Sequence, residues 1–395
     1  DLAAGAWACA VGGHRAALVR EVESYWPGER SLLCFSVRSG FDLLLQALAL
    51  QPDDEVIFSA LNVKGMINIV RREGYVAVPL DFDRDSITPT VEALRQALSP
   101  RSRVLVVAHL FGCRLQLDAL IDAARAAGLL VVEDCAQAFN GRAYAGHPRA
   151  DVAMFSFGPL KTTTALGGAL LNVRDSTLRE KMRSIQAGYP LQPTKRQAKR
   201  VLQFAGLKLL TLPLVFGLVQ RLFALAGRDY EDAVAESVRN VAVLKKAKNL
   251  RFQCSTALAA LLWRRLQRFD PASLERRAAQ GRRLTSLLAD CVTLPGQANR
   301  HHDYWAFPAV VGEPLKFIAA LRREGFDAAN LPRSQAVAAP DDRPQLEPTR
   351  AAALLSNLVV LPCYDDLPDR ELQRMAALVR EAAPQRPPAP VSAAE

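Results

Sequence analysis

The chain has 395 residues, of which 50% are hydrophobic and 23% charged, so general disorder and low-complexity classes are excluded. At about 150 residues per domain, this length predicts two or three domains. The seven cysteines lie far apart without a C-x-x-C pair, which argues against a disulfide framework or a zinc site and for a reducing compartment. The five histidines also lack ligand spacing, and we expect no metal.

The formal net charge of +10 is concentrated in one part of the chain. Between residues 190 and 251, twelve Lys or Arg residues stand against four acids, so this stretch alone carries +8. A partner attracted by positive charge is therefore expected to bind there. The residues that follow Asp1 lack the basic and apolar segments of a signal peptide, and none is predicted.

Between residues 40 and 175, short apolar runs alternate with segments of helical spacing. The helical segments are 63–73, 90–98 and 115–127, and the runs that indicate buried strands are Glu55–Ser59, Tyr75–Phe82, Val104–His109, Leu129–Glu133 and Val152–Phe157. One more strand is expected directly after Gly168. This alternation predicts an α/β fold with a mostly parallel sheet and helices on both faces.

The second half is predicted to be mainly helical, with helices at 176–187, 253–269 and 273–290 and two more within 201–226. A smaller C-terminal α+β domain should follow, with strands in 303–311 and 357–362 and helices at 314–324 and 368–382. The expected domain ranges are an N-terminal helical segment 1–30, a large domain 31–250, a linking helix with the small domain over 251–382, and a disordered tail 383–395.

Two residues at the ends of predicted strands carry candidate chemistry. Asp134 ends an apolar strand, and ligands of open α/β sheets bind beyond the carboxyl ends of strands, although a helix N-cap is the simpler reading of this residue alone. Lys161 lies among apolar, hydroxyl and glycine residues between two strands. Burial there would lower the lysine pKa and make the amine a nucleophile for Schiff-base chemistry; the plain alternative is an ammonium group that reaches solvent from a loop.

Two further segments are equally ambiguous when taken alone. Ser39 and Gly40 open a predicted helix, where backbone N–H groups can hold a phosphate, although Ser39 also suits a plain N-cap. Asn249 and Arg251 belong to an N-x-R turn before a long helix, which by itself is an ordinary polar turn.

Together, and in this order, these segments resemble the DegT-type sugar aminotransferases, a family of fold-type-I enzymes that depend on pyridoxal 5′-phosphate (PLP). The likeness covers residues 30–380 and includes Ser-Gly at 39–40, His-Leu-Phe-Gly at 109–112, Glu-Asp-x-Ala-Gln at 133–137, Ser-Phe-x-x-x-Lys at 156–161 and Asn-x-Arg at 249–251. The resemblance implies the fold-type-I PLP-transferase fold, with a seven-stranded-type sheet and a smaller C-terminal α+β domain.

The resemblance also implies roles for these residues. Lys161 would carry PLP as a Schiff base and move a proton to and from the substrate, and Asp134 would pair with the protonated pyridine nitrogen. Gln137 would hydrogen-bond the phenolic oxygen. The cofactor phosphate would be held by Ser156 and the N–H groups of Ser39, Gly40 and Phe41 in one subunit, and by Asn249 and Arg251 of the other, in an obligate homodimer with shared active sites.

This chain departs from the family pattern at several positions. Phe41 stands where a threonine is usual, which loses a hydroxyl but keeps the backbone donor. Val63 stands where an aromatic ring usually stacks on PLP, so an aliphatic cover is expected, and Phe139 replaces a usual histidine. These losses leave the PLP assignment standing and put an ordinary nucleotide-sugar substrate in doubt.

An apolar insert, 193–230, interrupts the large domain. Basic residues precede the run Val201–Ala226, which Pro213 splits into two halves that each keep a polar face. Two short amphipathic helices on an anionic membrane surface fit best; self-packing, a lipid-accepting pocket wall and a true span stay open. Continuous apolar runs favour lipid over nucleic acid. The residues expected to contact the membrane are Lys195, Arg196, Lys199, Arg200, Leu207, Leu210, Leu214, Phe216, Leu222 and Phe223.

The sequence therefore predicts a PLP-dependent aminotransferase (transaminase) of amino sugar biosynthesis, which moves an amino group from an amino acid to a keto-sugar or a lipid-linked acceptor. Glutamate is the donor that the resemblance implies. The expected location is cytoplasmic, with peripheral (monotopic) attachment to the inner face of the membrane. Two alternatives stay open: a PLP enzyme of another reaction type on a lipid precursor, and a catalytically idle membrane-associated sensor on the same fold.

Overall fold

The structure is a computed structural model, and it describes residues 14–210, 212, 215, 250–332 and 334–382. The chain divides into two compact units. Unit 1 comprises residues 1–48 and 156–269, and unit 2 comprises residues 49–155 and 270–395. Each unit is therefore built from two separate stretches of the sequence.

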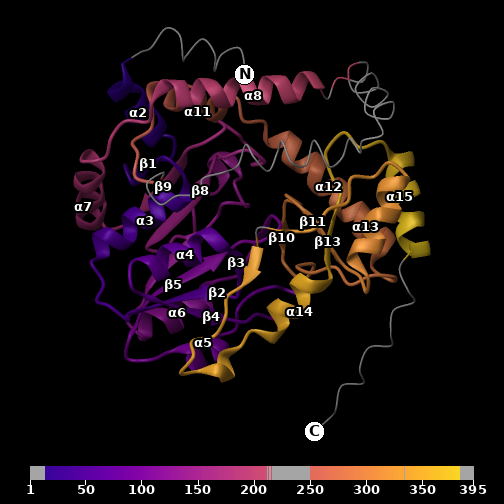
Figure 1. Ribbon diagram of the computed structural model, residues 1–395, viewed down its shortest axis with the longest axis horizontal. Helices are drawn as coiled ribbons and strands as arrows, with labels where there is room; N and C mark the ends of the chain where they lie inside the picture. The colour runs from indigo at the N-terminus through magenta and orange to yellow at the C-terminus, as the bar shows by residue number, and fades with distance from the viewer. Residues whose placement is uncertain (1–13, 211, 213–214, 216–249, 333, 383–395) are drawn as a thin grey trace. The chain divides into compact units, whose positions relative to one another are not determined.

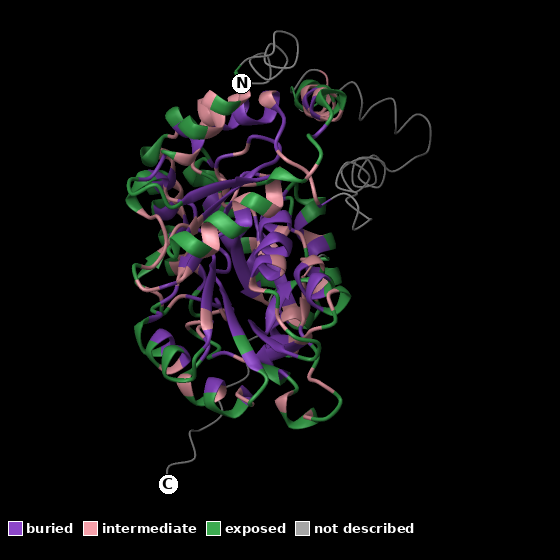
Figure 2. Ribbon diagram, turned by 90° about the vertical axis from the view of Figure 1, so that its left-hand side faces the viewer, coloured by how far each residue is buried: buried purple, intermediate pink, exposed green. Residues whose placement is uncertain are grey.

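Seven strands form one sheet in the order β1-β9-β8-β7-β5-β2-β4. The parallel pairs join β8 (Val152–Ser156), β7 (Leu130–Asp134), β5 (Ser102–Ala108), β2 (Glu55–Ser59) and β4 (Val76–Leu80). At one edge, β1 (Ser31–Cys34) pairs antiparallel with β9 (Ala169–Val173). The predicted mostly parallel, seven-stranded sheet is confirmed. Its central strands are buried along nearly their whole length (Figure 2), which is why they read as continuous apolar runs.

Three helices cover the sheet within the described part of unit 2. They are α4 (Lys64–Arg72), α5 (Val91–Ala97) and α6 (Asp118–Ala126). The apolar faces of α5 and α6 join the main core of this unit, and α4 packs on β4. The side chain of Thr90 accepts the N–H of Ala93 and so caps α5 at its first turn. The three helices predicted from spacing are therefore present, each a few residues shorter than predicted.

In the described part of unit 1, five helices accompany the β1–β9 pair. They are α2 (Arg15–Glu23), α3 (Val37–Leu48), α7 (Ser176–Ala187), α8 (Thr194–Leu210) and α11 (Thr256–Gln267). α3 packs on α7 and β9, while α11 lies between α2 and α8. The prediction that the helical part of the insert begins at residue 201 is wrong, because α8 already begins at Thr194 and includes the basic residues before 201.

The C-terminal α+β part belongs to unit 2. Figure 1 shows α12 (Pro271–Leu288), α13 (Pro314–Arg323) and α15 (Asp369–Ala382) around the antiparallel pair of β11 (Phe307–Val310) and β13 (Leu358–Leu361). This smaller part is confirmed, with a helix that the sequence did not predict, α14 (Thr349–Asn357). Short pairs join β6 (Cys113–Arg114) to β10 (His301–His302) and β3 (Leu61–Val63) to β12 (Ser334–Ala336). Single turns of 3-10 helix lie at Gly141–Ala143 and Pro344–Leu346.

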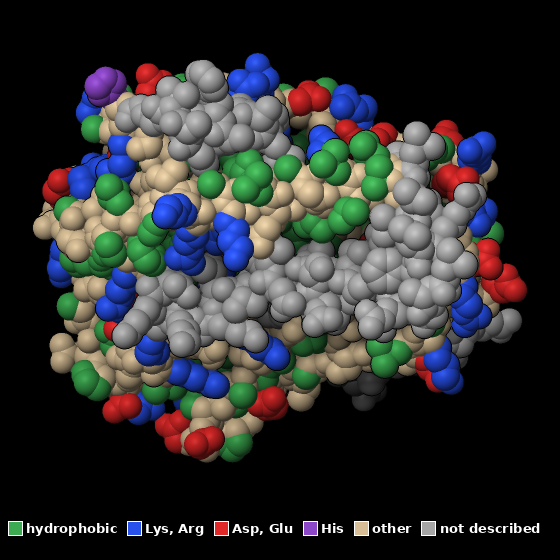
Figure 3. All heavy atoms as spheres, turned by 45° about the horizontal axis from the view of Figure 1, so that its top comes forward, with side chains coloured by type: hydrophobic (Ala, Val, Ile, Leu, Met, Phe, Trp, Pro, Cys, Tyr) green, Lys and Arg blue, Asp and Glu red, His purple; other side chains and the backbone are tan. Residues whose placement is uncertain are grey.

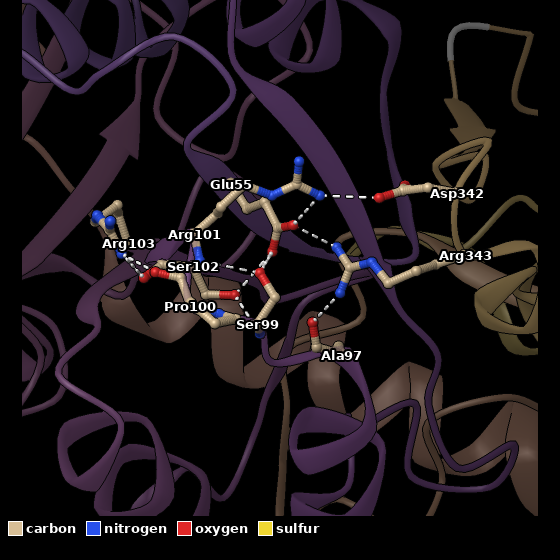
Figure 4. A network of polar contacts seen from close by, with 9 residues as sticks. All are labelled: Glu55, Ala97, Ser99, Pro100, Arg101, Ser102, Arg103, Asp342 and Arg343. Carbon is tan, nitrogen blue, oxygen red and sulfur yellow. Dashed lines mark hydrogen bonds and ion pairs between the residues drawn. The ribbon is translucent and has the colours of Figure 1, made fainter.

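A charged network anchors the amino end of β2. The side chain of Glu55 is 0% exposed and accepts from Arg343 at 2.6 Å, while the nearest guanidinium nitrogen of Arg101 lies at 3.3 Å (Figure 4). The hydroxyls of Ser99 and Ser102 donate to the same carboxylate at 2.7 and 2.9 Å. Because the carboxylate is fully paired, its burial is tolerated. The network lies at the amino ends of the strands, whereas ligands of parallel sheets bind at the carboxyl ends, so we assign it a structural role.

Candidate active site

The residues expected to bind the cofactor are divided between the two units, and the geometry within each unit is as follows. In unit 2, Asp134 is the last residue of β7 and is only 8% exposed. One of its carboxylate oxygens accepts the N–H of Ala136 at 3.0 Å. The backbone of His109 donates to the carbonyl of Asp134, so the loops that follow β5 and β7 lie side by side at the carboxyl edge of the sheet.

Gln137 is fixed at the same edge by one half of its amide. Its side-chain oxygen accepts the N–H of Phe111 at 2.7 Å. Phe111 has a positive φ of 60°, and the next residue, Gly112, has a φ of 93°, so this tight turn presents the Phe111 N–H to Gln137. The bond leaves the Gln137 amide nitrogen as the group that can donate to a ligand.

Glu133 and its partners form a buried network behind Asp134. The Glu133 carboxylate, which is 0% exposed, accepts the N–H of His147 at 2.6 Å, the hydroxyl of Tyr144, and the Nε2–H of His109 at 2.5 Å. His109 is the neutral tautomer with its proton on Nε2, because its Nδ1 accepts the N–H of Leu115 at 3.1 Å. Successive strand residues point to opposite faces, so the network holds the end of β7 from the face opposite to Asp134.

The pKa of Glu133 reflects two opposing effects. Burial raises the pKa of this carboxyl, but the hydrogen bonds from the His109 ring, the Tyr144 hydroxyl and the His147 N–H outweigh burial and hold the pKa below its usual range. Sequence analysis identified Glu133 only as part of a motif and missed His109, Tyr144 and His147 as its partners. A buried acid demands donors, but residues 144 and 147 lie in a loop whose path the sequence does not indicate.

The side chains of His109, Glu133 and Cys135 also form a group whose ligand atoms lie within 4.8 Å of one another. Both ring nitrogens of His109 are engaged in hydrogen bonds, and burial raises the pKa of the Cys135 thiol well above its usual range. A cation would have to displace these bonds and deprotonate a buried thiol. We therefore assign the group to the support of β7.

Asn62 was passed over as a candidate, although the structure gives it an unusual environment. It is 4% exposed, and its side-chain oxygen accepts the N–H of Val63 at 2.8 Å, while its amide nitrogen is buried without a partner among the described residues. A buried unpaired donor is costly unless a ligand or water meets it. Val63 itself is 37% exposed, and its predicted role as an aliphatic cover for PLP stays a prediction.

His302, in β10, makes the stability of unit 2 depend on pH. Its Nδ1 accepts the N–H of Tyr304, its ring stacks on the Tyr304 ring at 3.9 Å, and burial, assisted by the charge of Arg277, lowers its pKa from 6.5 to about 4. Between these two pH values the unfolded chain binds this proton and the native chain does not, so the free energy of unfolding should fall as the pH drops, by at most about 3 kcal/mol. Urea denaturation of wild type and His302→Gln at pH 7 and 4.5 measures this contribution. Equal pH slopes for the two proteins would refute it.

In unit 1, Lys161 lies in a loop closed by backbone hydrogen bonds. Phe157 donates to Gly168 at 3.0 Å, and its carbonyl accepts from Ala165 and Gly167 at 2.9 and 3.1 Å. The Lys161 N–H donates to the carbonyl of Gly158 at 3.3 Å. The neighbouring Leu160 and, at the far end, Leu166 have positive φ values of 68° and 60°, which are strained for leucine. The loop is therefore held in a defined, strained shape around Lys161.

The inner face of α8 supports this loop. The side chain of Gln197, which is fully buried, donates to the carbonyl of Ala165 at 3.4 Å, and the guanidinium of Arg200 donates to the carbonyl of Leu166 at 3.1 Å. The N–H of Gly168 in turn donates to the carbonyl of Phe35 at 3.0 Å, next to the start of α3. The loop that carries Lys161 is thus joined both to the insert and to the helix expected to hold phosphate.

The start of α3 differs from the prediction. The helix begins at Val37, with the Ser36 hydroxyl accepting the N–H of Ser39 at 3.1 Å and the Ser36 carbonyl accepting the N–H of Gly40 at 2.9 Å. Phe41 lies a full turn inside the helix, and its ring is completely buried. The N–H groups of Ser39 and Gly40 thus donate to Ser36 within the chain, and their predicted role toward a phosphate stays a prediction. The hydroxyls of Ser36 and Ser39 lie 2.9 Å apart at this end of the helix.

Arg251 contacts its own chain. Its guanidinium pairs with the carboxylate of Asp42 in α3, at 3.0 and 3.4 Å, and Asp42 is 0% exposed. Gln46 donates to the same carboxylate at 2.7 Å. The expected reach of Arg251 to a neighbouring subunit stays a prediction, and Asn249 lies outside the described residues.

α8 is only partly the basic, membrane-facing helix that the sequence predicted. Arg196 and Arg200 fold over the ring of Phe35, at 5.2 and 5.6 Å, and do not form an exposed edge. The outer stripe of α8 contains Lys195, Lys199, Leu202 and Leu209, of which the two leucines are 70% and 60% exposed. Figure 3 shows hydrophobic and basic side chains together on this side of the molecule.

The other predicted membrane contacts are only partly described. Leu210 is 38% exposed and Leu207 is intermediate, whereas Leu214, Phe216, Leu222 and Phe223 lie outside the described residues. Among the helices of the described part of the chain, none is both long and apolar enough to cross a bilayer.

A mostly parallel sheet with a buried acid at the end of β7, and a lysine in a closed loop after β8, are the features of the fold-type-I class of PLP-dependent enzymes. Residues 1–380 match the model of the DegT/DnrJ/EryC1/StrS aminotransferase family, and the chain belongs to this family. The recognition made from sequence motifs is thereby confirmed, together with the dependence on PLP that defines the family.

A GDP-perosamine synthase from Caulobacter vibrioides is 28% identical to the chain over 193 residues, which are 48% of this chain and 52% of that protein. The chain thus matches about half the length of this relative. Two solved structures share the fold with a TM-score of 0.69. One is the aminotransferase TlmJ from Streptoalloteichus hindustanus, which is 20% identical, with 96% of this chain and 94% of that chain covered. The other is DesV from S. venezuelae in complex with a ketimine intermediate, which is 23% identical, with 96% of this chain and 93% of that chain covered.

Proposed function

We propose that this protein is an aminotransferase that uses PLP to move an amino group from an amino acid, with glutamate as the expected donor, to a keto-sugar or related acceptor. The observation that carries the proposal is the carboxylate of Asp134, desolvated at the carboxyl end of a central strand. Such a carboxylate is stabilised by a cation, and a protonated pyridine nitrogen supplies one. The match to a GDP-perosamine synthase supports a sugar as the acceptor.

The donor set in the two units suits the chemical groups of PLP. Asp134 would hold the proton on the ring nitrogen, the free half of the Gln137 amide would donate to the phenolic oxygen, and the Ser156 hydroxyl would bind the phosphate. At the start of α3, the hydroxyls of Ser36 and Ser39, which lie 2.9 Å apart, would add further donors to the phosphate. PLP, when bound, supplies the electron sink that lets the carbon beside the amino group release a proton. Lys161 would accept that proton and return it at the neighbouring atom.

The glutamate half-reaction tests this function directly. Protein loaded with PLP is mixed with glutamate without an acceptor, and the visible absorbance of the cofactor is followed. We expect conversion to the pyridoxamine form with one equivalent of 2-oxoglutarate released. Absence of conversion with glutamate and with the other common amino acids would favour the idle sensor. If mass spectrometry finds a product that has gained no amino group, the enzyme catalyses another type of reaction.

We also infer a homodimer with shared active sites, because the family resemblance brings the N-x-R segment to the neighbouring subunit. Light scattering after gel filtration should give twice the chain mass of 43.2 kDa. A monomer that performs the half-reaction at full rate would refute the shared site.

The outer stripe of α8 supports a peripheral attachment to an anionic membrane on the cytoplasmic side, and with it a lipid-linked acceptor. The stripe places Lys195 and Lys199 in one half and Leu202 and Leu209 in the other, and α8 contains no acidic residue. Basic and apolar side chains on one face suit anionic headgroups. Flotation with phosphatidylglycerol vesicles should recover the intact chain, and a Leu202→Gln, Leu209→Gln double variant should float less. If the intact chain stays in the soluble fraction, the membrane proposal fails.

A further inference from the structure

Two arginines of α8 lie close together without an acidic partner among the described residues. Arg196 and Arg200 are one turn apart, and their guanidinium carbons lie 5.2 and 5.6 Å from the centre of the Phe35 ring. The Arg196 guanidinium also lies 5.4 Å from the ring of Phe252. Phe35 directly precedes Ser36, so both cations sit near the amino end of α3.

Positive charge is in excess around Arg196 and Arg200. Burial, together with the like charges of Arg196 and Arg38, lowers the pKa of Arg200 to about 10. Two carboxylates in the described part of unit 1 have other partners: the partly buried Glu23 pairs with Arg183, and the buried Asp42 pairs with Arg251. Contacts with aromatic rings offset part of the cost of holding two like charges together, but they do not neutralise them.

We propose that Arg196 and Arg200, with the charge of Arg38 beside them, form a binding site for the phosphate or diphosphate group of a small-molecule ligand. Planar guanidinium groups donate paired N–H bonds that match phosphate oxygens. The amino end of α3 adds the favourable end of a helix dipole. Arg200 also donates to the carbonyl of Leu166, so the site adjoins the loop that carries Lys161.

The proposal rests on the proposed function in one respect, which is the source of the phosphate. In an aminotransferase of this family the group belongs either to PLP or to a phosphorylated acceptor. Arg196 and Arg200 lie in α8, and Arg38 directly precedes Ser39. The family resemblance assigns no role to these three arginines. The shared chemistry is an organic phosphate, and the experiment below separates its two sources.

The first arm measures the binding of inorganic diphosphate by titration calorimetry, both to the apo protein and to the PLP-loaded protein. Arg200→Gln should weaken binding about tenfold or more, and Arg196→Gln should act in the same direction. Arg200→Lys should retain part of the affinity, because it keeps the charge but not the paired donors. Lys199→Gln is the matched control, since it removes the same charge from the exposed side of the same helix, and its affinity should stay within about twofold of wild type.

The second arm titrates the apo protein with PLP and with pyridoxal, which lacks the phosphate. If Arg200→Gln weakens PLP binding but not pyridoxal binding, the cofactor phosphate occupies the site. If only diphosphate binding is lost, the site belongs to the acceptor. The proposal is overturned if Arg200→Gln and Lys199→Gln behave alike in both arms. Thermal unfolding of the wild type needs no variant and compares diphosphate with chloride at equal ionic strength. We expect the unfolding temperature to be higher with diphosphate than with chloride. Neither arm requires turnover, so a silent glutamate half-reaction would leave the anion site standing.

Discussion

Replacing Lys161 with alanine is expected to lower the rate of the glutamate half-reaction by at least about 10³-fold. The side-chain amine is the one group in the loop 157–168 that can move a proton at neutral pH, so its loss removes the transfer step and leaves binding to other residues. The fold of the loop should survive, because its closing bonds between Phe157 and Gly168 are made by the backbone. Stopped-flow absorbance on PLP-loaded protein measures the effect.

Two comparisons make the Lys161 result specific. Lys64→Ala, which removes an exposed lysine from α4, should react like the wild type. Borohydride should fix the cofactor to the wild type and to the Lys64 variant, at a peptide that contains residue 161, and to no peptide of Lys161→Ala. A Lys161→Ala protein with full transaminase activity would end the assignment.

Replacing Glu133 with alanine should lower the free energy of unfolding by about 3 kcal/mol or more. The carboxylate meets three donors in a fully buried place, namely the His109 ring, the Tyr144 hydroxyl and the His147 N–H. Removal leaves all three donors without an acceptor. Glu133→Gln keeps one oxygen and should fall between alanine and wild type. Urea denaturation at pH 7 gives the values, and Glu180→Ala, on the surface of α7, should change the free energy by less than about 0.5 kcal/mol.

The stabilisation by Glu133 should also disappear in acid. Its pKa in the folded protein lies below the usual 4.5, since the hydrogen bonds from His109, Tyr144 and His147 overcome burial. A carboxyl with a lowered pKa stabilises the native state above pH 4.5, and this contribution is lost as the pH falls through the folded pKa. The difference between wild type and Glu133→Ala should therefore shrink below pH 4.5. A difference that stays constant down to pH 3 would contradict this assignment.

The central strands were predictable because each is buried on both faces and therefore apolar throughout. β1 was not, since its four residues, Ser31–Cys34, are followed almost directly by a helix, and its antiparallel pairing depends on β9, which lies far along the chain. The start of α3 shows a local ambiguity: Ser36 and Ser39 both suit a helix cap, and hydrogen bonding selects Ser36.

The candidate site shows the same division between local and long-range information. Asp134 and Lys161 follow apolar strands and are marked by local sequence. The donors to Glu133 come from two different loops, and the direction of Arg200 toward Leu166 depends on a helix packed from a distant part of the chain. Sequence patterning identified α8 as amphipathic but assigned its arginines to the outer face, because helical spacing alone does not say which polar residues point inward.

The two sides of α8 belong to different tasks. On one side, Gln197 and Arg200 donate to backbone carbonyls of the loop that carries Lys161, and on the other side leucine and lysine side chains are exposed. Because α8 is one helix, a displacement caused by a contact on one side also changes the contacts on the other side. By thermodynamic linkage, a partner that binds the outer side and displaces α8 must change the affinity for a ligand at the Lys161 loop. Binding of that ligand must then change the affinity for the partner by the same factor.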